Sequence, residues 1–226
     1  MMMNCKVFVL IIAVAMAGMG TADGQSLKDY TFSYRATMKI TNAGKVEGTQ
    51  LFYWMEPDAA YFGTEVVVDG ARSQVMVMDA DVDGMVMFMD DGKRKTAMML
   101  GGNQSLMANI LPGKTDQDAA EATVTPIEGK TILGYSCKGF RIETDKGMSD
   151  VWITEEAPVG LVGEAFGKNV MPAGLPDLGG SALLMEMEYT DKDRKGDKMR
   201  MECTELKPME LTIHKADYNL MTSPFQ

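Results

Sequence analysis

The fold is decided by the stretch LLMEMEYTDKDRKGDKMRMEC, residues 183–203. Methionine alternates with charged residues on both sides of a charged centre, and a period of two places side chains on opposite faces of a β-strand. The centre, residues 191–197, combines charge with a glycine, as hairpin tips do. The stretch therefore predicts two long antiparallel strands, each with a methionine face and a charged face.

The same alternation extends over twelve residues at 30–41 and predicts a long strand with one dry and one wet face. Other short apolar or alternating runs are separated by turn residues, and they predict strands at 46–55, 60–69, 74–78, 85–89, up to residue 100, 130–133, 137–143 and 148–154. Short helices are expected at 104–111 and 159–171. Together, these strands and helices predict a mainly β fold. A large curved antiparallel sheet forms a half-barrel with one or two short helices on its concave side.

The N-terminal segment has the pattern of a secretory signal peptide. Lys6 precedes an apolar run at residues 7–19, and small residues follow at 20–24. This run is shorter than the ~20 residues that span a bilayer, and no later stretch is long and apolar enough to do so. We therefore expect a signal peptide at 1–24 and a single β-rich domain at 25–226. The protein would be exported to the periplasm or the extracellular space and soluble after cleavage.

Composition excludes several classes of function. The chain has 32 acidic and 22 basic residues and a net charge of −10, which argues against a nucleic-acid partner. Its single histidine, His214, is better read as a surface or core residue than as a catalyst, because no nucleophile is placed to pair with it. Neither a phosphate-binding loop nor a dinucleotide-binding fingerprint is present. The sequence therefore predicts a protein that is not an enzyme.

Two cysteines remain after signal cleavage, Cys137 and Cys203. An even pair in an exported chain predicts one disulfide between them. The alternative is a pair of free buried thiols.

Methionine is unusually abundant, at 23 residues, and many methionines recur at i, i+2 on predicted strands. They have three interpretations: core filler, a pliable apolar groove for a lipid or hydrophobic peptide, and a soft-metal site for Cu(I). For the groove, the expected lining residues are Tyr34, Met38, Met185, Met187, Met199 and Met201.

An acidic segment, DADVDG at residues 79–84, has the spacing of a calcium-binding loop. Its position twelve is an aspartate rather than the usual bidentate glutamate, and its flanks read as strands. The candidate Ca²⁺ ligands are Asp79, Asp81, Asp83 and Asp90, and the alternative is a solvated hairpin tip. Apart from this possible Ca²⁺, no cofactor is expected.

A longer motif carries a family resemblance. The stretch PIEGKTILGYSCKGFRIETDKGMSDVWIT, residues 126–154, resembles an exported bacterial family known as domain of unknown function 4412, as do the segments at 61–63 and 77–79. The resemblance implies a half-barrel like that of lipoprotein carriers, an antiparallel sheet curved around an apolar hollow. It implies an exported, β-rich and lipid-facing protein, and it supplies no catalytic residue.

Three hypotheses of function follow. The leading one is an exported, non-enzymatic binding protein whose methionine-lined hollow takes a lipid acyl chain or a hydrophobic peptide. The first alternative is a metal-handling protein, which binds Cu(I) through methionine or Ca²⁺ through residues 79–90. The second is a structural or interaction module whose sheet is plugged by its own helices.

Overall fold

The computed structural model describes residues 27–42, 45–68, 71–82, 84–100, 122–145, 147–160, 182–192 and 198–221, and the statements below concern these ranges. In this part of the chain, no helix is long and apolar enough to cross a membrane. Helical structure here is limited to two short 3₁₀ turns, η1 (Ala80–Val82) and η3 (Lys215–Asp217). The helix predicted at 104–111 lies outside the described residues, as does all but the first two residues of the helix predicted at 159–171.

The first half of the chain forms an antiparallel meander in which each strand pairs with the one before it. The strands are β1 (Tyr30–Asn42), β2 (Lys45–Met55), β3 (Tyr61–Val68), β4 (Ala71–Asp79), β5 (Gly84–Asp90) and β6 (Lys95–Leu100). Their bounds agree closely with the predicted ones, because each strand is ended by a turn that the sequence marks.

The second half supplies β7 (Thr123–Ile132), β8 (Tyr135–Glu143), β9 (Gly147–Thr154), β10 (Leu183–Asp191), β11 (Lys198–Ile213) and the short β12 (Asn219–Met221). The pairing of β11 with β1 joins the two halves into one twelve-stranded sheet of order β12-β6-β5-β4-β3-β2-β1-β11-β10-β9-β8-β7. All neighbours are antiparallel except β12, which runs parallel to β6. Strand β7 is longer than expected, since only 130–133 was predicted there.

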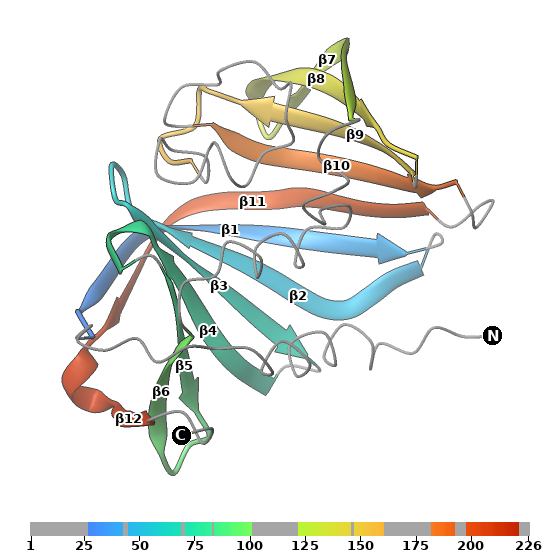
Figure 1. The fold of residues 1–226 in the computed structure, drawn as a ribbon. Helices are drawn as coiled ribbons and strands as arrows, with labels where there is room; N and C mark the ends of the chain where they lie inside the picture. Colours follow the sequence, from blue (N-terminus) through green and yellow to red (C-terminus); the bar gives the residue numbers. More distant parts are fainter. Residues whose placement is uncertain are drawn as a thin grey trace.

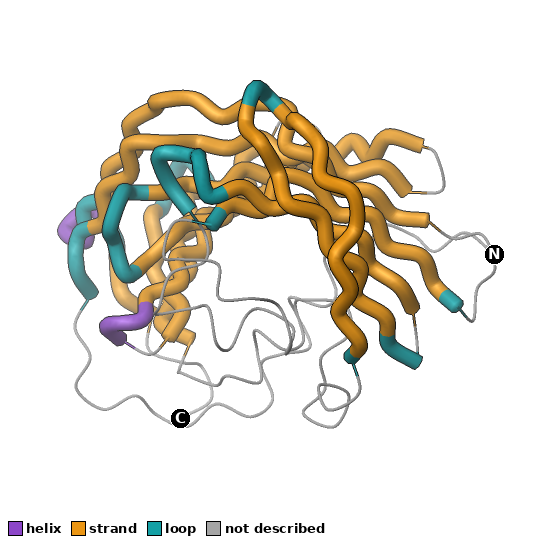
Figure 2. The backbone as a smooth tube through the Cα atoms, turned by 90° about the horizontal axis from the view of Figure 1, so that it is seen from above, coloured by secondary structure: helices purple, strands orange, loops and turns teal. Residues whose placement is uncertain are grey.

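The sheet is bent into an open arch. Figure 1 shows the long strands β1, β2, β10 and β11 at its centre, and Figure 2 shows the arch from above, with strands descending on both sides. The predicted mainly β half-barrel is therefore confirmed. The predicted hairpin at 183–203 is also confirmed, because β10 and β11 pair with Met187 opposite Met201.

Strand β1 departs from the predicted pattern of a single dry face. Phe32 packs in a cluster with Trp54, whereas Met38 packs in a cluster with Met55. Trp54 and Met55 are consecutive residues of β2 and point to opposite faces, so the buried side of β1 changes between its two ends. The change coincides with a register shift between Phe32 and Tyr34 in the pairing with β11. Such irregularities bend a strand and redirect its side chains.

Candidate functional site

One face of the sheet carries the methionines of β1, β10 and β11, and we call it the methionine face. Met38 is paired with Cys203, and Met187 is paired with Met201. Directly paired residues point to the same face, and Met201 and Cys203 share a face because they are two residues apart on β11. The face therefore continues across these three neighbouring strands.

The structure brings five of the six predicted lining residues into one apolar cluster. Met38 and Met185 are buried and Met201 is nearly so, while Tyr34 and Met187 are half-buried and pack against them. The sixth residue, Met199, is paired with Tyr189 toward the tip of the hairpin and does not belong to this cluster. The cluster is also covered by Ala157 and Val159 from the segment after β9.

The methionine face extends beyond the predicted lining, on the same face of the sheet, to the strands on the far side of β2. A second apolar cluster on β3, β4 and β5 consists of Phe62, Met78, Met85 and Met87. Tyr53 on β2 packs against both clusters and connects them. In the sequence, the i, i+2 spacing of methionines on these strands indicates the second cluster. The position of these strands beside the first cluster depends on the strand order, which local spacing does not determine.

The opposite face of β10 and β11 is charged. Glu186, on β10 between two methionines, is only 2% exposed and forms ion pairs with Lys130 Nζ at 2.8 Å and Arg200 Nε at 2.9 Å. Burial disfavours its negative charge, but the hydrogen bonds from Arg200 and Lys130 outweigh that effect and lower the pKa of Glu186. Arg200 also lies 3.5 Å from Glu202. Motif reasoning missed this network, because Lys130 reaches it from β7.

A glycine allows β7 to approach this network. Trp152 on β9 is paired with Gly139 on β8, and its indole Nε1 donates a hydrogen bond to the Glu128 carbonyl oxygen at 3.1 Å. A Cβ atom on Gly139 would lie 2.6 Å from that same oxygen, a distance that no packed carbon tolerates. The bare backbone at Gly139 thus lets residues 128–130 pass over β8.

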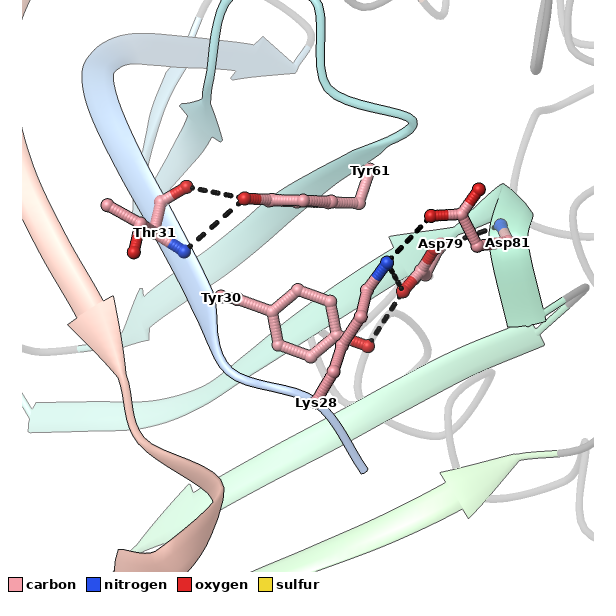
Figure 3. Close-up of polar contacts among 6 residues, drawn as sticks. All are labelled: Lys28, Tyr30, Thr31, Tyr61, Asp79 and Asp81. Atoms are coloured by element: carbon pink, nitrogen blue, oxygen red, sulfur yellow. Dashed lines mark hydrogen bonds and ion pairs between the residues drawn. The ribbon is translucent and has the colours of Figure 1, made fainter. Parts of the chain in front are cut away.

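The candidate calcium ligands Asp79 and Asp81 are bound to a protein cation instead. Lys28 Nζ lies 2.9 Å from Asp79 Oδ2 and 2.8 Å from Asp81 Oδ2, and the Tyr30 hydroxyl donates a hydrogen bond to Asp79 Oδ2 at 2.9 Å (Figure 3). Partial burial of Lys28 opposes its charge, yet the two carboxylates raise its pKa overall. The ammonium occupies the position between the two carboxylates that a bound cation would need.

The same cluster fixes the start of β1. The Tyr61 hydroxyl donates a hydrogen bond to the Thr31 carbonyl oxygen at 3.0 Å, and the Tyr30 and Tyr61 rings meet edge to face with centroids 5.1 Å apart (Figure 3). Burial, followed by the neighbouring Asp79 carboxylate, raises the pKa of Tyr30, so this hydroxyl remains a donor. The cluster is therefore a structural anchor.

The structure does not bring the remaining candidate calcium ligands together. Asp83 lies outside the described residues. Asp79 is paired with Gly84 at one end of β5, whereas Asp90 is the last residue of that strand. Six residues of extended chain separate Gly84 from Asp90 by roughly 20 Å. A calcium loop needs its first and twelfth positions on one ion, and the β4–β5 hairpin keeps them apart. Among the described residues, no group of three or more His, Cys, Asp or Glu side chains is placed to hold a metal ion.

The predicted disulfide is not formed, because Cys137 and Cys203 are both buried free thiols. Strands β9 and β10 lie between β8, which carries Cys137, and β11, which carries Cys203. Three strand spacings correspond to about 14 Å along the sheet, whereas a disulfide needs Cα atoms ~6 Å apart. Both thiols nevertheless belong to one apolar cluster, although Cys137 is paired with Lys130 of the charged network. Burial raises the pKa of Cys203 to about 11, and it also raises that of Cys137.

The single histidine lies away from both faces. His214 is exposed, and its Nδ1 is 3.5 Å from a carboxylate oxygen of Asp29. This agrees with its interpretation as a surface residue.

Comparison with known proteins identifies a family and distant structural likenesses. A family model described as "Domain of unknown function (DUF4412)" matches residues 32–168. No curated protein matches the sequence. Similar solved structures include PNGF-II, with 15% identity and a TM-score of 0.47 over 84% of this chain. A chain from the Pseudomonas aeruginosa MucA/MucB complex has 12% identity and a TM-score of 0.43 over 89%. The Mycobacterium tuberculosis lipoprotein LppX has 9% identity and a TM-score of 0.34 over 88%.

These likenesses differ in how much of the other protein they include. The matched region spans 30% of the PNGF-II chain and 56% of the chain from the MucA/MucB complex, but 94% of LppX. With TM-scores below 0.5 and such low identities, the function of this chain has to be argued from its own residues.

Proposed function

We propose that this chain, which belongs to the DUF4412 family, is an exported, non-enzymatic binding protein whose methionine face holds an apolar ligand. The ligand is a lipid acyl chain or a hydrophobic peptide segment. Residues 1–24 are then the signal peptide, and residues 25–226 the binding domain.

The observation that carries this proposal is the contrast between the two faces of β10 and β11. Met187 and Met201 are paired on one face, while Glu186 and Arg200 form an ion pair on the other. The methionine face continues through Tyr53 to the second cluster and lies on a sheet bent into an arch (Figure 2). Flexible thioether side chains repack around ligands of different shape. A curved sheet with such a lining is suited to a long apolar molecule.

Two isosteric substitutions on neighbouring residues test the proposal. Glutamine has nearly the shape of both methionine and glutamate, so Met187→Gln changes the methionine face and Glu188→Gln changes the exposed side of the same strand. Binding of the fluorescent hydrocarbon 1,6-diphenylhexatriene to the delipidated protein is measured for each variant. Met187→Gln should weaken binding about tenfold, because the ligand would desolvate an amide without giving it a partner. Glu188→Gln should leave the affinity unchanged.

Two outcomes would contradict the proposal. One is a folded wild-type protein that shows no saturable binding of the hydrocarbon, which would favour a structural or interaction module. The other is equal affinity for Met187→Gln and the wild type. Far-ultraviolet circular dichroism of both variants controls for loss of the sheet.

Soft-metal binding is a second candidate function, and the free thiols favour it. Cys203 belongs to the same buried cluster as Met38, Met185 and Met201, and Met38 is its direct partner across the sheet. Thiolate and thioether ligands together select Cu(I). Because burial raises the pKa of Cys203 to about 11, the metal would have to displace a proton, and affinity should increase with pH.

Anaerobic titration with Cu(I) against a chromophoric chelator tests the second candidate. We expect one tightly bound ion that Cys203→Ser releases, while binding of the hydrocarbon persists in that variant. Failure of the wild type to compete with the chelator would exclude this candidate and leave the first one unaffected.

A further inference from the structure

An unpartnered hydroxyl group lies within the methionine face. Thr64 on β3 is only 7% exposed, and its Oγ1 atom is buried without a hydrogen-bond partner in the described structure. Thr64 is two residues from Phe62 on the same strand, so both side chains lie on the same face. Phe62 belongs to the second methionine cluster. The hydroxyl therefore sits in apolar surroundings that do not satisfy it.

A buried hydroxyl of this kind needs an explanation. Buried polar side chains in native proteins nearly always have a partner, and leaving one without a partner destabilises the fold. Valine has the shape of threonine without the hydroxyl, and it would fill this position without that penalty. The missing partner is therefore expected to come from outside the protein chain. A ligand on the methionine face is in the right place to supply it.

The surroundings of Thr64 favour an uncharged partner. On this face, β3 is flanked by Leu51, Tyr53 and Met55 on β2 and by Gln74, Met76 and Met78 on β4. None of these six residues carries a charge at neutral pH, since burial raises the pKa of Tyr53 to about 12. A carboxylate or phosphate placed here would be desolvated without a counter-ion, which is strongly unfavourable. A neutral hydroxyl or ester group needs only a hydrogen bond.

We infer that Thr64 is a polar subsite that selects acyl ligands carrying an uncharged hydrogen-bonding group, such as an alcohol or an ester, over free fatty acids. This inference rests on the proposed function, because it requires an apolar ligand on the methionine face. Thr64 Oγ1 either donates to the ligand's carbonyl oxygen or exchanges hydrogen bonds with its hydroxyl. The apolar chain extends from there along the methionines.

The test compares wild-type protein with Thr64→Val, using 1,6-diphenylhexatriene as a fluorescent hydrocarbon probe. Binding of the probe itself is measured first, and then its displacement by 1-decanol, methyl decanoate and decanoate. Thr64→Val should bind decanol and methyl decanoate about fivefold more weakly than wild type does, which is the loss of one neutral hydrogen bond. It should bind the hydrocarbon probe equally well. Decanoate should be the weakest competitor for the wild type.

A matched variant and a second readout keep the result interpretable. Thr212→Val makes the same change at an exposed position on β11 and should alter none of these affinities. Thr64→Val should also have a higher Tm than the wild type in the absence of ligand, because it removes the unsatisfied group. Equal losses for the hydrocarbon and the alcohol, or no loss for either polar ligand, would overturn the Thr64 subsite. Failure of the wild type to bind the hydrocarbon probe would overturn the proposed function itself.

Discussion

The ammonium of Lys130 on β7 lies 3.3 Å from the centroid of the Trp152 ring on β9, although β8 separates the two strands. Lys130 also forms an ion pair with Glu186 on β10, and Glu186 forms a second ion pair with Arg200 on β11. One buried carboxylate thus links the edge of the sheet to its central strands. The network therefore connects β7, β10 and β11 on the face opposite the methionines.

Glu186→Gln should destabilise the protein by about 2 kcal/mol. The substitution keeps the side-chain shape but removes the negative charge from two charge-assisted hydrogen bonds, each of which contributes roughly 1.5–3 kcal/mol when fully formed. Urea denaturation followed by tryptophan fluorescence measures the effect. Glu188→Gln on the same strand is the control and should cost less than ~0.5 kcal/mol, because its carboxylate is exposed. Equal effects of the two substitutions would show that the buried network does not stabilise the sheet.

The contribution of Glu186 should also depend on pH in a defined direction. Its pKa is lowered in the folded protein relative to the ordinary value of 4.5. A group of this kind stabilises the fold above its unfolded pKa, and the stabilisation is lost as the pH falls through its folded pKa. The stability difference between wild type and Glu186→Gln should therefore be constant from pH 7 down to about pH 5 and shrink below it. A difference that grows on acidification would contradict the assignment.

Lys28→Met should destabilise the start of β1 by about 1–2 kcal/mol, because the buried Asp79 carboxylate loses its counter-ion. The effect should be smaller in an Asp79→Asn background, where no charge remains to be neutralised. Lys93→Met, in the exposed turn before β6, is the control. Thermal melts of the two single variants, the double variant, Lys93→Met and the wild type give the coupling energy between Lys28 and Asp79.

Added Ca²⁺ should not raise the Tm of the wild type, since Lys28 occupies the space between Asp79 and Asp81. A Ca²⁺-dependent rise in Tm would show that these carboxylates bind calcium.

Leu133→Asn should stabilise the protein by about 1 kcal/mol. Leu133 and Gly134 form the two-residue turn between β7 and β8 with φ angles of 52° and 87°. Such turns favour asparagine at the first position, whereas a leucine with positive φ is strained. Leu133 is also 46% exposed, so little apolar burial is lost. Leu220→Asn, at a similarly exposed residue without positive φ, should give no gain. Stabilisation by both would show that the gain comes from replacing an exposed apolar side chain and not from the φ angle of the turn.

The features that the sequence predicted well depend on local alternation. The β10–β11 hairpin follows from the spacing of Met185, Met187, Met199 and Met201, because a strand fixes the face of each side chain within a few residues. Turn residues likewise marked the ends of most strands. The family resemblance at 126–154 is confirmed by the family model.

The features that the sequence predicted wrongly depend on contacts between distant segments. The disulfide failed because two strands lie between β8 and β11, and strand order is not encoded in cysteine parity. The candidate calcium ligands are not brought together, because the chain after Asp79 forms a hairpin and Lys28, 51 positions earlier, lies between the acids. The change of face within β1 arises from register shifts against β11. Thr64 was missed because only the packed structure shows that its hydroxyl lacks a partner.

NMR of protein labelled with ¹³C at the methionine methyl groups would show whether an apolar ligand binds to the methionine face. On titration with 1-decanol, we expect saturable shifts for Met187 and for Met76, which are half-buried on that face. Met209, which is exposed and belongs to neither cluster, should not shift. A shift confined to Met209, or no saturable shift at any methionine, would show that no ligand binds to the methionine face.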